Sequence, residues 1–241
     1  FAAIDPVHQH THSTLRHHAN VLCASDFVIG TNEPLLWKNC SPGVAEIVRE
    51  TLSEIESFGG RVIDVPLPEV ADSIELLHSG NVVAAEVGKF LGNKLPAWLK
   101  TLDPVVSARL ADGISITKDE YLRRRRLLEK LQIQVQSHFD QCDVIASPTV
   151  SITPPALDDV SNVAGYRPQN LAALRNTCAG NSLGLCAITI PAGLDAAGMP
   201  VGLQLMAPHG KDDKLLCIAS CIERLVGDRA VRIGCIPDIP R

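Results

Sequence analysis

The residues with the clearest potential for chemistry lie near the start of the chain, where five of the eight histidines fall: His8, His10, His12, His17 and His18. His10 and His12 would share one side of an extended strand, and histidine-rich tracts can bind zinc. No carboxylate or cysteine is spaced to complete a tetrahedral ligand set. We therefore expect a mobile terminal segment that binds metal only adventitiously, and we predict neither a metal site nor a cofactor. A metal-binding protein that uses these histidines is the alternative.

A hydrolase that attacks a carbonyl carbon needs a nucleophile, a base and hydrogen-bond donors for the oxyanion. We predict no G-x-S-x-G nucleophile elbow, and no two serines are adjacent. H-E-x-x-H, P-loop and G-x-G-x-x-G motifs are absent. Paired carboxylates such as Asp158 and Asp159 fit a solvated turn. The sequence therefore predicts no catalytic residue of its own.

Four consecutive arginines, Arg123 to Arg126, could bind phosphate. At about 100° per residue they would wrap around a helix and share no single face. Asp119, Glu120 and Glu129 lie at helical spacing from them. We expect solvated ion pairs at this position.

Composition narrows the class of protein. The 241 residues are 46% hydrophobic and 4% aromatic, with a net charge of −5, which favours a packed globular chain with an aliphatic core. The negative charge argues against a nucleic-acid partner, and no apolar stretch is long enough to cross a membrane. Eight cysteines without a C-x-x-C pair or a signal-peptide pattern indicate reduced thiols in a cytoplasmic protein. Because the chain starts at Phe1 and not at methionine, we expect a piece of a longer protein.

Helical and strand patterns alternate along the chain, which predicts the α/β class. Strands are expected at residues 26–30, 61–65, 143–147, 185–190 and 201–206, the fourth of them buried on both faces. Helices are expected from Ser41-Pro42 to Gly59-Gly60, within 70–100, from a capping box at Thr117 to about His138, at 170–178, and from Asp212 onward. A long loop covers 151–170, a short rigid connection covers 191–200, and the tail after Gly227 is irregular.

One block of sequence resembles the carboxy-terminal part of the amidase signature family. It shows a threonine, Asn-x-x-Gly, a buried strand ending Pro-x-Gly, Gly-x-Pro-x-Gly-x-Gln, and an acidic pair before a closing helix. The matching residues are Thr177, Asn181, Gly184, Pro191, Gly193, Gly198, Pro200, Gly202, Gln204 and Asp213. Residues 143–149 (DVIASPT) and 59–68 (GGRVIDVPLP) are similar to two further family segments. The likeness covers roughly residues 42–227.

The resemblance implies a mixed β-sheet with helices on both faces, incomplete at its amino-terminal side. It also implies metal-free hydrolysis of amide C–N bonds by a serine nucleophile, a second serine in a cis peptide, and a lysine base. Those residues lie upstream in the family, so no position here inherits them, and we expect the chain alone to be inactive. Thr149, Thr177 and Asn181 are the residues we place nearest the substrate channel, with strand termination and turn capping as their structural alternative. The loop from Ser151 to Asn170 would help to set substrate choice.

The resulting domain assignment is an irregular histidine-rich segment at 1–30, the carboxy-terminal portion of an amidase domain at 31–227, and a tail at 228–241. The expected partner is a small-molecule amide, bound only with the missing catalytic half. A second copy of the chain, in a homo-oligomer, is a further candidate partner. A non-catalytic remnant or partner subunit of an amidase or amidotransferase complex is the alternative function.

Overall fold

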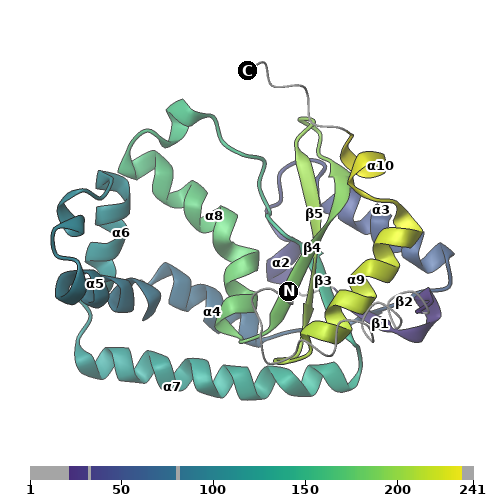
Figure 1. Cartoon of the computed structure of the whole chain (residues 1–241), viewed down its shortest axis with the longest axis horizontal. Coiled ribbons are helices and arrows are strands. Elements are labelled where there is room, and N and C mark those ends of the chain that lie inside the picture. Colours follow the sequence, from purple (N-terminus) through teal and green to yellow (C-terminus); the bar gives the residue numbers. More distant parts are fainter. Residues whose placement is uncertain (1–21, 32–33, 80–81, 235–241) are drawn as a thin grey trace.

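The computed structural model describes residues 22–31, 34–79 and 82–234, which form one mixed sheet with helices on both faces (Figure 1). The strand order is β2-β1-β3-β5-β4. The strands are β1 (Val28–Thr31), β2 (Arg61–Asp64), β3 (Val144–Pro148), β4 (Cys186–Leu194) and β5 (Pro200–Ala207). β1 is parallel to β2 and β3, whereas β5 is antiparallel to β3 and β4. The predicted fold class is confirmed, and the two aliphatic strands are neighbours.

Two helical layers cover the sheet. Helices α3, α9 and α10 lie on one side, and α8 lies on the other, with α4 to α7 beyond it (Figure 1). The helices are α2 (Pro34–Trp37), α3 (Val44–Ser57), α4 (Glu69–His78), α5 (Val82–Lys94), α6 (Pro104–Ile114), α7 (Lys118–Gln134), α8 (Val163–Ser182), α9 (Asp212–Val226) and α10 (Arg229–Ile233). Short 3₁₀ turns lie at Ala24–Asp26, Trp98–Lys100, Val135–Asp140 and Leu157–Val160. No described helix combines the length and the apolar composition that a membrane span requires.

The core is aliphatic, as expected from the low aromatic content. On α3 the buried side chains include Val48, Leu52 and Ile55, which recur at helical spacing and face the sheet. On α9 the same pattern buries Ile218 and Ile222. The two helices predicted in these segments are therefore present, and each buries one apolar stripe.

The start of α3 differs from the prediction. The helix begins at Val44, with Gly43 as its N-cap residue, and Ser41-Pro42 form the turn before it. Gly43 has φ 89°, and a Cβ there would clash with the backbone of Ala196. The Ser41 hydroxyl instead accepts a hydrogen bond from the amide of Thr153, 2.9 Å away.

β4 is longer and more open than predicted. It runs past Ile190 to Leu194, with a register irregularity between Pro191 and Gly193. Ala187 and Thr189, which lie on one face of β4, are exposed, whereas Ile190 on the other face is buried. The prediction that this strand is buried on both faces is therefore wrong: its apolar run packs on one face only.

The predicted loop from Ser151 to Asn170 is also too long. α8 begins at Val163, where the side chain of Asn162 accepts a hydrogen bond from the amide of Gly165. Pro168 lies inside this helix, although glycine and proline together indicated a loop. A second short helix, α10, occupies part of the tail that was expected to be irregular, and Asp228 caps it.

The remaining predictions concern the four consecutive arginines, the cysteines and the early histidines. Arg123 and Arg124 both pair with Glu120, and Arg125 pairs with Glu129. Solvated ion pairs are confirmed for Arg123 and Arg125, whereas Arg124 is buried and also donates to the carbonyl of Ser79 at 3.0 Å, so the prediction is wrong for its surroundings. The cysteines between Cys23 and Cys221 are free thiols. The five early histidines lie outside the described residues, and within those residues no group of three or more potential metal ligands is found.

Candidate functional site

The candidate site lies where β3 ends. The backbone amide of Thr149, the residue after β3, donates to the carbonyl of Gly202 on β5 at 2.9 Å. The Thr149 hydroxyl is hydrogen-bonded to the hydroxyl of Thr189 on β4. We call these two residues the threonine pair. A Cβ at Gly202 would clash with both hydroxyls, so glycine is required under the pair.

A cavity of about 350 Å³, here called the β3-end cavity, is open next to the threonine pair. Apolar side chains dominate its lining, and the polar groups are the threonine pair and Asp195. This volume and this mixture are typical of small-molecule sites. Its lining residues are Val44, Thr149, Val150, Ile152, Pro154, Thr189, Ile190, Pro191, Asp195, Pro200, Val201, Gly202 and Ile233.

Asp195 holds the turn between β4 and β5. Its carboxylate accepts hydrogen bonds from the Thr153 hydroxyl at 2.6 Å and from the amides of Ala197 and Met199 at 2.9 and 2.8 Å. These bonds, led by the one from Thr153, lower the pKa of Asp195 below its ordinary value. The carboxylate is therefore ionised at neutral pH and fixed in its role of connecting the turn to the segment after β3.

The structure brings one of the three predicted site residues, Thr149, to this cavity. Thr177 lies on α8, where its hydroxyl donates to the carbonyl of Leu174 at 3.2 Å. Asn181 lies near the end of the same helix with an exposed side chain. Neither Thr177 nor Asn181 lines the β3-end cavity. Substrate contact stays a prediction for all three residues.

Asn176, which the sequence reasoning passed over, is fully buried and joins three elements. Its side-chain amide donates to the carbonyls of Leu36 on α2, at 2.9 Å, and Pro148 on β3, at 2.6 Å. Its Oδ1 accepts from Nε of Arg175 at 3.1 Å. The sequence did carry a signal for its burial, because Asn176, Ala179 and Gly180 recur at helical spacing and form the buried face of α8. Asn176 thus fixes the end of β3 next to Thr149.

Two cysteines outside the β3-end cavity, Cys40 and Cys142, are poor nucleophiles. Burial raises the pKa of Cys40, and this effect prevails over the nearby cations Arg175 and Arg49. Burial likewise raises the pKa of Cys142 to about 11. Both side chains are therefore thiols at neutral pH.

A serine with elbow-like spacing also lies outside the site. The string Gly180-Asn181-Ser182-Leu183-Gly184 has the G-x-S-x-G spacing, which the sequence analysis overlooked. Ser182 is the last residue of α8, whereas a nucleophile elbow joins a strand to a following helix. Its hydroxyl lies 3.6 Å from the sulfur of Cys178, which cannot act as a general base for it. This serine therefore lacks the setting of a catalytic nucleophile.

Comparison with known proteins defines the class. The amidase family model matches residues 8–216, which is most of the chain. This chain belongs to the amidase family.

Curated relatives and solved structures agree with that class. The chain is 36% identical over 212 residues to 2-amino-5-chloromuconic acid deaminase of Comamonas testosteroni, covering 88% of this chain and 46% of the relative. It is 33% identical over 190 residues to a fatty acid amide hydrolase of Oryza sativa subsp. japonica, covering 76% and 30%. The chain thus spans less than half the length of these relatives.

The solved structures show the same fold. A structure of 6-aminohexanoate cyclic dimer hydrolase superposes with a TM-score of 0.72 at 18% identity, covering 88% of this chain and 47% of the other. Kluyveromyces lactis allophanate hydrolase superposes with a TM-score of 0.68 at 17% identity, covering 83% and 32%.

Proposed function

We propose that this chain forms the carboxy-terminal portion of an amidohydrolase that hydrolyses the C–N bond of a small-molecule amide. The observation that carries the proposal is the match to the amidase family over a chain spanning less than half of its relatives. The other portion of the enzyme would supply the Ser–cisSer–Lys triad that the family resemblance implies. The described portion supplies the sheet and one wall of the substrate channel.

The chemistry of the threonine pair supports a wall and not a reaction centre. The two hydroxyls bond to each other, and Thr189 additionally donates to the carbonyl of Leu203 at 3.4 Å. Among the residues that the structure describes, neither hydroxyl has a histidine, lysine or carboxylate partner that could remove its proton. Hydroxyls in this state can orient a substrate amide by hydrogen bonding, while the apolar lining of the β3-end cavity holds its carbon skeleton.

The test compares two proteins: the 241-residue chain, called the printed chain below, and the longer product translated from the gene when the coding sequence preceding Phe1 is included. A fluorophosphonate probe, which labels activated serines, should label the longer product and not the printed chain. Ammonia release from a panel of primary amides should follow the same division. Labelling of the printed chain, or a longer product without labelling and without ammonia release, would overturn the proposal in favour of an independent activity or a non-catalytic subunit.

The proposed role of Thr149 in the channel wall is tested with two matched variants of the longer product. Thr149→Val removes the hydroxyl next to the cavity at nearly constant volume, and the control Thr101→Val removes an exposed hydroxyl directly after the 3₁₀ turn Trp98–Lys100. A hydrogen bond to substrate contributes about 1 kcal/mol, so we expect kcat/KM to fall roughly 5- to 10-fold for the first variant. The second should change it less than about twofold. Equal effects, or no effect of Thr149→Val, would refute the wall role.

A further inference from the structure

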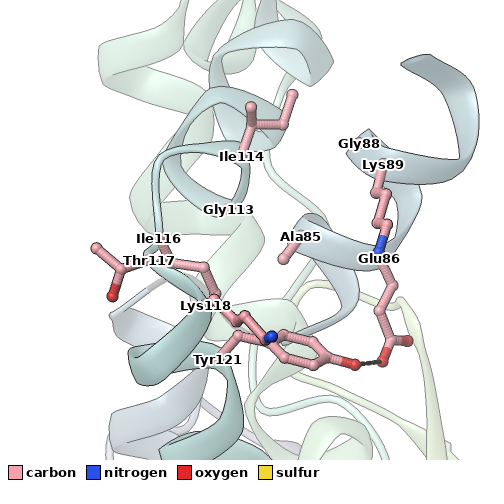
Figure 2. A pocket seen from close by; sticks show the side chains of 10 residues that line it. All are labelled: Ala85, Glu86, Gly88, Lys89, Gly113, Ile114, Ile116, Thr117, Lys118 and Tyr121. Atoms are coloured by element: carbon pink, nitrogen blue, oxygen red, sulfur yellow. Dashed lines mark hydrogen bonds between the residues drawn. The ribbon is translucent and has the colours of Figure 1, made fainter. Parts of the chain in front are cut away.

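A second cavity, of about 470 Å³, lies in the helical layer formed by α5, α6 and α7, and we call it the helical cavity (Figure 2). None of its lining residues belongs to the sheet or to the β3-end cavity. Its volume falls within the range of about 300–1,000 Å³ that small-molecule sites occupy. It lies outside the wall proposed above and requires its own explanation.

Two glycines set the walls of the helical cavity. A Cβ at Gly88 on α5 would clash with Ile114, and a Cβ at Gly113 on α6 would clash with Ala84. Glycine at both positions therefore lets α5 and α6 approach closely. The first turn of α7 closes the third side with Lys118 and Tyr121, as Figure 2 shows.

The lining separates into an apolar part and a cationic part. The apolar part consists of Ala85, Ile114, Ile116 and the ring of Tyr121. The cationic part consists of Lys89 on α5 and Lys118 on α7, whose side chains come from different walls (Figure 2). Within the part of the chain that the structure describes, neither ammonium group has a carboxylate partner within 4 Å.

The one carboxylate of the lining, Glu86, is already occupied. It accepts a hydrogen bond from the hydroxyl of Tyr121 at 2.8 Å and lies 4.0 Å from Arg125. The bond to Glu86 raises the pKa of Tyr121, so the phenol keeps its proton and remains a donor. In the first turn of α7, the carboxylate of Glu120 is likewise held by arginines. The helical cavity therefore holds two unpaired cations beside an apolar surface.

We propose that the helical cavity binds a small organic carboxylate with a short apolar body. The carboxylate lies at the rim near Lys89 and Lys118, and the body packs on Ile114, Ile116 and the ring of Tyr121. The start of α7 adds to the attraction, because Thr117 caps only the amide of Glu120 and the earlier amides of that turn carry the positive end of the helix dipole. The site stands independently of amide hydrolysis, since the helical cavity shares no lining residue with the β3-end cavity.

The test is calorimetric titration of the full chain with hexanoate. We expect binding that weakens when NaCl is raised from 20 to 300 mM, because exposed ammonium groups are screened by salt. The double variant Lys89→Met and Lys118→Met keeps the aliphatic stems and should lower affinity roughly 5- to 10-fold. Lys130→Met, an exposed position further along α7, is the matched control and should bind as the original chain does. Hexan-1-ol, which lacks the charge, should bind more weakly than hexanoate and be insensitive to the lysine changes.

A second measurement keeps the proposal testable if the double variant fails to fold. In ¹⁵N spectra of the unmodified chain, hexanoate should shift the amides of residues 85–89 and 113–121. Absence of binding at low salt, shifts confined to other segments, or equal weakening by Lys130→Met would overturn the proposal.

Discussion

Replacing Asn176 by alanine tests whether the polar network under α8 holds the end of β3. The side-chain amide connects α8 to α2 through the carbonyl of Leu36 and to β3 through the carbonyl of Pro148. No water can replace it easily, because the residue is fully buried. The substitution therefore leaves buried polar groups without partners.

The expected loss in the free energy of unfolding is estimated by counting the polar groups that lose a partner. The carbonyl of Leu36 loses its side-chain donor, at a cost of about 1–3 kcal/mol for an unsatisfied buried group. The carbonyl of Pro148 keeps the hydroxyl of Ser147 at 3.2 Å, so its loss is nearer ~1 kcal/mol. Nε of Arg175 loses its acceptor, at about 1 kcal/mol. We expect a total of about 3–5 kcal/mol, which lowers Tm by roughly 6–20 °C in a chain of this size.

Urea unfolding followed by circular dichroism measures this loss. The matched control is Asn181→Ala, the same substitution five residues later on α8 at an exposed position, which should change the free energy of unfolding by less than about 0.5 kcal/mol. A loss below about 1 kcal/mol for Asn176→Ala, or equal losses for the two variants, would refute the reasoning.

Two further substitutions test local geometry and charge. Gly202→Ala places a Cβ against the hydroxyls of Thr189 and Thr149, so we expect about 1–3 kcal/mol of destabilisation in urea, relieved in part when Thr189→Ala is added because the Thr149 hydroxyl stays in place. Failure of the second change to relieve the first would argue against the clash. Hydrogen bonds from Arg123 and Arg124 lower the pKa of Glu120 from 4.5 to about 2, so its contribution to stability is present above pH 4.5 and is lost as pH falls toward 2. Glu120→Gln should therefore lower Tm at pH 7 but not at pH 2, and a difference independent of pH would contradict this origin.

The strands were predictable where their pattern is local. The apolar runs that became β1, β2, β3 and β5 lie within a residue or two of their predicted bounds. The extension of β4 through Pro191 to Leu194 was not predictable, because it depends on pairing with β5. The irregularity beside Gly193 lets the strand continue, although proline and glycine usually indicate a turn.

The candidate site was only partly predictable for a related reason. Thr149 could be placed because it directly follows a strand that ends in proline. Its partner Thr189 could not, because their contact depends on the order β3-β5-β4, which brings both hydroxyls over Gly202. On α8, Asn176 and Thr177 are consecutive residues, but Asn176 is buried and Thr177 is half-buried. The family motif begins with Thr177 and so does not include Asn176.

The pairing of β3, β5 and β4 explains why the threonine pair and the hydrogen bonds of Asn176 belong together. Thr189 lies opposite Gln204, and Gln204 lies opposite Ser147, so these three side chains share one face of the sheet. Gln204 donates to the Ser147 hydroxyl at 3.4 Å and to the backbone carbonyl of Asn176 at 3.5 Å. The polar row therefore starts buried beneath α8, at Ser147, and ends exposed at Thr189. At the open end the two threonine hydroxyls bond to each other, Thr189 also donates to the carbonyl of Leu203, and the amide of Thr149 donates to the carbonyl of Gly202. Both ends of the row therefore have fixed hydrogen-bond partners, which is the property that a substrate wall needs.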